Sequence, residues 1–304
     1  MLFGFLNIYK PSKLTSHDVV TRLRKMTGVK QIGHAGTLDP MAVGVLPMAI
    51  GSATRLLRFL ETDKIYIAEV LLGTATTTDD LDGQVLSEKT VDSAVASILP
   101  SVVAGFVGEQ KQKPPAYSAI HHGGKRLYEL AREGNIPDDV PLRDVWVEGI
   151  DIVSVELPAV KLRIKCSGGT YIRAIARDLG EKLGFGACLK SLIREKSGPF
   201  LLSQAHTLEA LDELAQGNRL ADAIVPPQAV LKMDIVKVDR EKAKILATGQ
   251  HLPVSSVASM TDDEAVDGKL CLVMCENSLI ALCQVTKDNR LHPEVVVGHA
   301  KSLV

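Results

Sequence analysis

Segments with strand-like and helix-like patterns follow one another along the chain. Residues 160–166 alternate apolar and cationic side chains with a period of two, which predicts a strand with one buried face. Residues 64–72 contain many β-branched and aromatic side chains, which also favours a strand. Further strands are expected at 4–9, 145–147 and 150–155, and helices at 19–26, 53–60, 91–99, 127–134, 172–183 and 208–215. This mixture predicts an α+β fold.

The pattern changes after the proline pair at 226–227, which is typical of a linker. Short strands are expected beyond it at 235–238, 270–274, 279–285 and 295–298, with one helix at 240–247. Short strands at this spacing are typical of a small β-barrel. We therefore expect two domains, residues 1–229 and 230–304.

Composition and charge narrow the class of protein. Hydrophobic residues make up 46% of the 304 residues, which is enough for a sizeable core, but aromatic residues only 4%. A net charge of −1 argues against one broad basic field, so affinity for RNA must come from locally placed cations. No apolar run approaches the length of a membrane span. The absence of a secretory signal and the five scattered cysteines predict a cytoplasmic protein with reduced thiols.

Potential metal ligands are present but poorly arranged. The acids within 79–82 are not followed by the glutamate that closes a calcium loop. His121 and His122 have no third ligand at a useful spacing, and Cys271 and Cys275 lack the partners of a zinc site. The chain also lacks a glycine-rich nucleotide loop. We therefore expect neither a metal nor another cofactor.

One stretch of turns, residues 33–47, contains a single acidic residue, Asp39. Its glycines and prolines constrain the backbone, and Pro40 favours an extended conformation at Asp39. Apolar residues follow, so the carboxylate is expected at the edge of a core, where it needs a cation or hydrogen bonds. The alternative for an isolated Leu-Asp-Pro is a turn residue that caps a helix.

A second candidate lies where the strand at 160–166 meets the helix expected at 172–183. Two glycines between them allow a tight turn, and such a corner suits an anion. Arg173, in the first turn of this helix, is well placed to lean into a cleft. The alternative is a surface ion pair with Asp178 or Glu181 of the same helix.

The stretch Gly-His-Ala-Gly-Thr-Leu-Asp-Pro-Met-Ala-Val-Gly-Val-Leu-Pro resembles the catalytic motif of bacterial tRNA pseudouridine-55 synthases, the TruB family. Other motifs within residues 4–210 also resemble this family, and residues 234–300 more faintly resemble its PUA-like domain. The resemblance implies a pseudouridine synthase fold: a large mixed, mostly antiparallel sheet with a central catalytic cleft, flanking helices and a C-terminal PUA-like β-barrel. It further implies a thumb-like insertion at about 111–160 that grips tRNA.

The resemblance implies that uridine at position 55, in the T-arm loop of tRNA, is isomerised to pseudouridine without a cofactor. Asp39 matches the catalytic aspartate, Tyr66 the tyrosine that stacks on the flipped base, and Arg173 the arginine paired with the aspartate. Because Asp39 also needs a cation on physical grounds, Arg173 is our candidate partner. The sequence leaves open whether Asp39 attacks the sugar, attacks the base or removes a sugar proton.

The resemblance also suggests residues that bind the substrate. His34 would fill the space left by the flipped nucleotide or stack against it, and Leu192 would line the uridine pocket. Lys10 belongs to the opening motif at the edge of the site. Basic groups beside tyrosines in the insertion are expected to contact RNA; they are Lys113, Tyr117, Lys125 and Arg126.

Two alternative functions remain open. A guide-dependent RNA pseudouridine synthase shares the catalytic motif, but the long insertion and the lack of basic tails count against it. A non-catalytic tRNA chaperone is opposed by the intact set of Asp39, Tyr66 and Arg173. We expect a monomer that binds tRNA, with no obligatory protein partner and no membrane.

Overall fold

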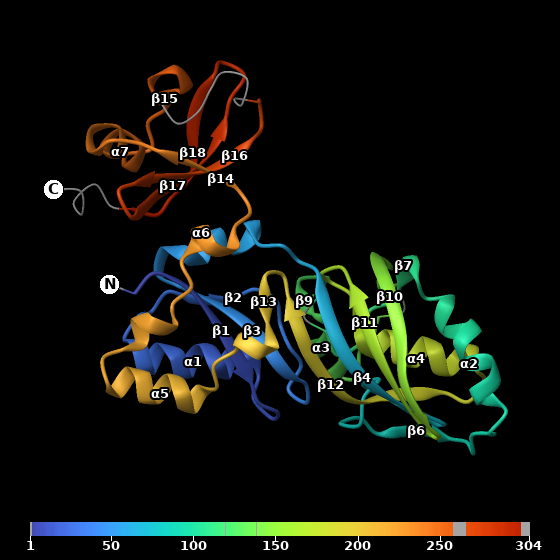
Figure 1. Cartoon of the computed structure of the whole chain (residues 1–304). Helices are drawn as coiled ribbons and strands as arrows, with labels where there is room; N and C mark the ends of the chain where they lie inside the picture. Colours follow the sequence, from blue (N-terminus) through green and yellow to red (C-terminus); the bar gives the residue numbers. More distant parts are fainter. Residues whose placement is uncertain (1, 119, 138, 258–265, 299–304) are drawn as a thin grey trace.

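The computed structural model describes residues 2–118, 120–137, 139–257 and 266–298. Its centre is a nine-stranded sheet (Figure 1), made of β1 (Gly4–Lys10), β2 (Ile32–His34), β3 (Val43–Ile50), β4 (Lys64–Leu72), β7 (Gly108–Gln112), β10 (Arg143–Glu156), β11 (Ala159–Cys166), β12 (Ala187–Ser197) and β13 (Phe200–Leu201). The order is β1-β3-β12-β4-β11-β10-β7, with β2 on β3 and β13 on β12. Only the β3–β12 pair is parallel, so the expected mostly antiparallel sheet is confirmed.

Helices flank this sheet at both ends (Figure 1). They are α1 (Ser16–Thr27), α2 (Val95–Ala104), α3 (Leu127–Arg132), α4 (Ile172–Lys182), α5 (Leu208–Gln216) and α6 (Pro227–Val230), with the 3₁₀ helices η1 (Gly51–Phe59), η2 (Leu202–Gln204) and η3 (Leu220–Ala223). Helix α1 begins where Thr15 and Asp18 form a reciprocal capping box. The helix expected at 91–99 instead occupies 95–104, and that expected at 53–60 is a 3₁₀ helix.

The core lies between the sheet and the helices packed on one face. The predicted strand at 64–72 is confirmed as β4, and its burial alternates, with Tyr66, Ala68 and Val70 buried and the residues between them partly exposed. In α4, Ile172, Ile175 and Leu179 belong to the same core cluster, so their helical spacing turns one face toward the sheet. The buried face of β4 and the apolar face of α4 therefore pack into the same core.

The predicted insertion at 111–160 is shorter than expected. Residues 143–156 form β10, which pairs with β11 and β7 inside the central sheet. The irregular hydrophobic pattern that suggested two short strands comes from two register shifts within this one strand. What stands apart from the sheet after β7 includes α3 and a small hairpin of β8 (His121–His122) and β9 (Lys125–Arg126). A second hairpin, β5 (Thr74–Thr76) with β6 (Val85–Glu88), follows β4.

A second sheet follows α6 and lies above it in the view of Figure 1. Its order is β14-β16-β17-β18-β15, made of β14 (Asp234–Lys237), β16 (Leu270–Cys275), β17 (Ser278–Val285), β18 (Arg290–Val296) and β15 (Leu252–Pro253), with α7 (Arg240–Ala247) and η4 (Val254–Ser256). One apolar cluster contains residues of both sheets, including Phe5, Val45, Leu272 and Leu282. The expected boundary at 229/230 stays a prediction, and residues 299–304 of the second domain lie outside the described part.

Two further observations concern membrane spans and metal sites. Within the described residues, no helix has the length and apolar character needed to cross a bilayer. In the same part of the chain, no three histidine, cysteine, aspartate or glutamate residues are grouped so that they could hold a metal ion. All five cysteines are buried and unpaired, and burial raises their thiol pKa values, to about 11 for Cys166.

Candidate active site

Asp39 and Arg173, 134 residues apart in the sequence, form a two-pronged ion pair. The Nε of Arg173 donates to Oδ2 of Asp39 at 2.9 Å, and its Nη2 donates to Oδ1 at 3.2 Å. Such parallel hydrogen bonds fix both the position and the plane of a carboxylate. The Arg173 side chain is 6% exposed and that of Asp39 is 31% exposed. The acid is therefore oriented by a buried cation while one part of it remains accessible.

Arg173 also joins two segments that lie far apart in the sequence. Its Nη1 donates to the carbonyl of Thr78 at 3.0 Å, and its Nη2 donates to that of Tyr117 at 2.9 Å. The carboxylate of Asp80 lies 3.7 Å from Nε, and burial raises the pKa of this acid. One guanidinium thus ties the Asp39 loop to the turn after β5 and to the segment after β7.

Hydrogen bonds to main-chain groups hold the residues on either side of Asp39. Ser16 Oγ accepts from the Leu38 amide at 2.9 Å and donates to the Leu38 carbonyl at 3.2 Å. On the other side, the Pro40 carbonyl accepts from the Lys10 ammonium at 3.2 Å. Both neighbours of Asp39 are therefore held, which limits the motion of the carboxylate.

The expectation that Lys10 contacts the substrate is wrong in this geometry. Lys10 is fully buried, and its Nζ donates to the carbonyls of Pro11, Leu14 and Pro40. Burial lowers its pKa to about 8, opposed by the nearby Asp39 carboxylate. Its ammonium is occupied by protein carbonyls, so Lys10 supports the loop.

Arg194 is a site residue that the sequence did not identify. It lies in β12 next to the parallel partner β3 and is 1% exposed. Its Nε donates to the carbonyl of Val45 at 2.7 Å, and its Nη atoms donate to Thr37 at 3.2 Å and Gly36 at 3.3 Å. Gly44 allows β3 to lie close to the Arg194 backbone, since a Cβ at position 44 would be 2.4 Å from the Arg194 carbonyl oxygen. Lysines and arginines recur through this segment, so no pattern in the sequence marked Arg194 as buried.

Tyr66 and Leu192 lie next to each other on the buried face of the sheet. Tyr66 pairs with Arg194 across β4 and β12, and Leu192 pairs with Ala68 in the same register. Tyr66 is 7% exposed, and burial raises the pKa of its hydroxyl, opposed by the Arg194 guanidinium. The phenol is therefore neutral at physiological pH. These two predicted residues lie side by side on one face of the sheet, next to Arg194, which holds the Asp39 loop.

His34 ends β2, five residues before Asp39. Burial lowers the pKa of its imidazole, and the Arg194 guanidinium acts in the same direction. Its Nδ1 is buried without a hydrogen-bond partner in the described part of the chain. A neutral ring with an unused nitrogen is suited to stacking or to a polar group of a ligand.

The four residues expected to contact RNA after β7 lie in different surroundings. Lys113 is exposed, and its carbonyl accepts from Arg177 at 3.0 Å. Tyr117 reaches the site through its carbonyl, which Arg173 binds. Lys125 forms an ion pair with Glu133 at 2.9 Å. Arg126 is exposed, and its guanidinium lies 5.9 Å from the ring of Tyr128.

Gln112 and Arg177 are two further residues that the sequence did not single out. The amide of Gln112 donates to the Tyr171 carbonyl at 2.9 Å and accepts from the Tyr171 amide at 2.8 Å. Arg177, one turn beyond Arg173 on α4, binds the Asp79 carboxylate at 3.0 Å. Burial raises the pKa of Asp79 to about 6. In the sequence, the only indication was a glutamine within an expected extended segment.

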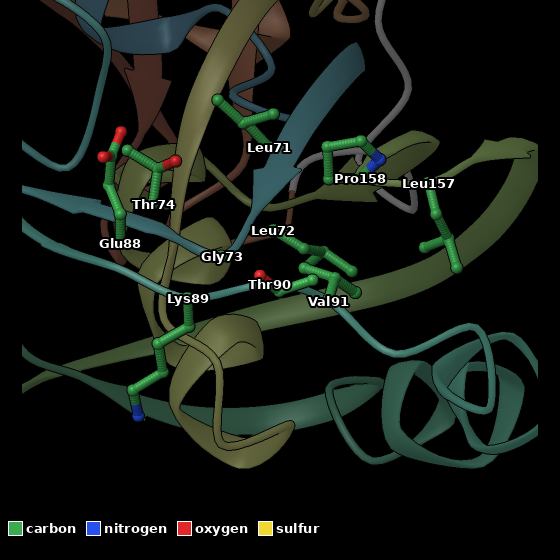
Figure 2. Close-up of a pocket in the computed structure, with 10 residues that line it drawn as sticks. All are labelled: Leu71, Leu72, Gly73, Thr74, Glu88, Lys89, Thr90, Val91, Leu157 and Pro158. Carbon is green, nitrogen blue, oxygen red and sulfur yellow. The ribbon is translucent and has the colours of Figure 1, made fainter.

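A separate hollow of about 460 Å³ lies at the other end of β4 (Figure 2). Its lining includes Leu72, Gly73 and Val91, with Leu157 and Pro158 from the β10–β11 turn. None of the predicted site residues lines it. The hollow is therefore separate from the Asp39–Arg173 pair.

Comparison with known proteins identifies the family of this chain. The model of the TruB family pseudouridylate synthase N-terminal domain matches residues 24–172, and that of the tRNA pseudouridylate synthase B C-terminal domain matches residues 173–232. A protein of Synechocystis sp. named tRNA pseudouridine synthase B is 44% identical, over 83% of this chain and 86% of its own. A protein of the same name from Acaryochloris marina is 40% identical, over 97% and 99%.

Solved structures show the same fold. A chain in a crystal structure of a Cbf5-Nop10-Gar1 complex has a TM-score of 0.72 and 26% identity, and the match covers 99% of this chain and 87% of that one. A chain in a structure of an H/ACA RNP bound to a substrate RNA has a TM-score of 0.71 and 25% identity, over 98% and 86%. The second sheet agrees with a PUA-like domain, as expected. From its sequence relatives and its fold, the chain belongs to the TruB family of pseudouridylate synthases.

Proposed function

We propose that this protein isomerises uridine to pseudouridine in tRNA, at position 55 of the T-arm loop. The observation that supports this most is the oriented Asp39–Arg173 pair, together with Tyr66 and Leu192 side by side on the buried face of the sheet. The family match and the names of the relatives make tRNA the substrate class. Position 55 and recognition of the T-arm are taken from the resemblance of the catalytic motif.

The reaction needs no net change of oxidation state. The bond from N1 of uracil to C1′ of the ribose is broken, the base turns, and C5 is bonded to C1′ while the C5 proton is lost and N1 regains one. In this scheme Asp39 acts as the nucleophile or base, and Arg173 orients it and balances its charge. Tyr66 stacks on the base, Leu192 lines its pocket, and His34 stacks near the flipped nucleotide. Lys113, Tyr117, Lys125 and Arg126 remain the proposed contacts to the tRNA arm.

The decisive experiment incubates the purified protein with an unmodified tRNA transcript and no other RNA or protein. Pseudouridine is mapped by sequence position, and a transcript with cytidine at position 55 is the control. Conversion at that uridine alone supports the proposal. Conversion only when a guide RNA is added would favour a guide-dependent enzyme instead. Absence of tritium release from C5-labelled tRNA, with tight binding, would indicate a non-catalytic chaperone.

Four predictions accompany this function. The protein acts as a monomer, its partner is tRNA alone, and the reaction takes place in the cytoplasm. The domain boundary at 229/230 belongs to the same set. Light scattering with and without tRNA would detect a stable dimer, which would contradict the first of these.

A further inference from the structure

Lys13 has an unusual backbone conformation beside the catalytic loop. It lies in the turn between β1 and α1, with φ at +69°. Side chains with a Cβ are strained in this left-handed region, and glycine adopts it freely. A glycine would therefore form the same turn without strain. A lysine at this position is thus useful for its side chain and not for its backbone. Strained backbone of this kind gathers at functional sites.

The turn is attached to the residues on either side of Asp39. The Lys13 amide donates to the Pro40 carbonyl at 2.8 Å, the same oxygen that accepts from Lys10 Nζ. Three residues later, Ser16 is bonded to both main-chain groups of Leu38. The position of Lys13 relative to the Asp39 carboxylate is therefore set by short, direct contacts.

Lys13 also differs from the other cations near Asp39. Arg173, Lys10 and Arg194 are 5%, 0% and 1% exposed, and the hydrogen bonds given above direct all three toward protein acceptors. The Lys13 side chain is exposed, and it has no hydrogen bond or ion pair with any residue of the described part of the chain. Pro40 beside it is exposed as well, so this cation stands at the rim of the site.

We propose that Lys13 binds a backbone phosphate of the RNA next to the nucleotide that enters the site. The inference rests on the proposed function, because it takes RNA as the ligand. A strand whose base is turned toward Asp39 brings its phosphates over the rim. An unpaired ammonium there attracts a phosphate and draws in the strand. Its role is binding of the strand and not the chemical step.

The test compares Lys13→Gly, Lys13→Gln and Lys13→Arg in steady-state pseudouridine formation on the tRNA transcript. Lys13→Gly removes both side chain and strain, and Lys13→Gln removes only the charge. Both should raise KM about two- to five-fold with little change in kcat, as loss of one exposed ionic contact does. Lys13→Arg should restore the wild-type KM. The slope of the logarithm of the tRNA binding constant against the logarithm of salt concentration should become shallower by about 0.7–0.9. That change corresponds to the loss of one phosphate contact.

Asn218→Gly provides the matched control. Asn218 is also exposed and has a left-handed φ of +55°, but it follows α5 and is not attached to the Asp39 loop. Its replacement should leave KM and the salt slope unchanged. Thermal unfolding of Lys13→Gly should begin no earlier than that of wild type, because glycine suits the turn.

Two results have distinct meanings. If wild type leaves the transcript unmodified, the proposed function fails, whatever Lys13 does. If wild type is active and Lys13→Gln keeps the wild-type KM and salt slope, the phosphate contact is overturned and Lys13 is only a turn residue.

Discussion

The side-chain amide of Gln112 forms two hydrogen bonds with the main chain of Tyr171, as another strand would. Gln112 ends β7, and Tyr171 is the N-cap of α4, two residues before Arg173. Because Arg173 also binds the Tyr117 carbonyl and Arg177 binds that of Lys113, the end of β7 and the segment after it are attached to α4 at three points. The orientation of the Asp39–Arg173 pair thus depends on a segment that we expect to touch tRNA.

Gln112→Glu should therefore slow turnover while binding changes little. The carboxylate can accept from the Tyr171 amide, but it places an oxygen against the Tyr171 carbonyl where a donor stood. We expect kcat to fall about tenfold and the free energy of unfolding to fall by about 1–3 kcal/mol. Gln112→Met, which removes both bonds without adding charge, should behave similarly. Wild-type kcat in both variants would show that α4 is held well enough by its apolar face.

Asp39→Asn should abolish turnover and leave tRNA affinity nearly intact. The amide has almost the same shape but cannot act as nucleophile or base, whereas phosphate contacts supply most of the affinity. We expect a loss of at least about 10³-fold in kcat. Tritium release and filter binding measure the two quantities. A loss of less than about tenfold, or about 1.4 kcal/mol of barrier, would mean that another group carries the chemistry.

Arg173→Lys should keep the charge and lose the orientation. A lysine offers a point charge in place of two parallel bonds, and it cannot also reach the carbonyls of Thr78 and Tyr117. We expect kcat to fall by about 10²-fold, and further for Arg173→Met. Single-turnover rates at saturating protein isolate this step. Full activity of the lysine variant would reduce the role of Arg173 to its charge alone.

Arg194→Met should lower both stability and kcat, although Arg194 is buried beneath the loop. Three carbonyls, those of Val45, Thr37 and Gly36, would lose their donor. We expect the free energy of unfolding to fall by about 2–4 kcal/mol, measured in urea. Arg163→Met on β11, which removes a half-exposed arginine paired with Glu195, is the control and should cost no more than about 1 kcal/mol. Equal effects of the two variants would contradict the role of Arg194.

Because the pKa of Lys10 is lowered by burial, we expect the free energy of unfolding to depend on pH between about 8 and 10.5. Its pKa is about 8 when folded and near 10.5 as a model value, so between these limits the unfolded chain binds more protons. The stability of wild type should therefore rise with pH through that window, relative to Lys10→Met, by up to about 3 kcal/mol. Below pH 8 the difference should be constant. A difference that stays flat up to pH 10.5 would mean that the three carbonyls keep the ammonium protonated.

Local features of this protein were determined by the sequence itself. The capping box of Thr15 and Asp18, the alternation of β11 and the bounds of α7 each depend on residues within a few positions. The motif at 33–47 likewise identified Asp39, and the need of its carboxylate for a cation could be stated before the partner was seen. Short-range sterics, hydrogen bonding and periodicity are sufficient for such features.

Tertiary structure decided which cations face the substrate and which support the fold. Lys10 and Arg194 had the pattern of exposed cations, but strand pairing brings carbonyls of the Asp39 loop around them and closes them from water. The 134-residue separation of Asp39 and Arg173 is bridged only when α4 packs on β12, the strand that pairs with β3. Burial depends on what the rest of the chain covers, and that is a property of the packed molecule and not of any local pattern.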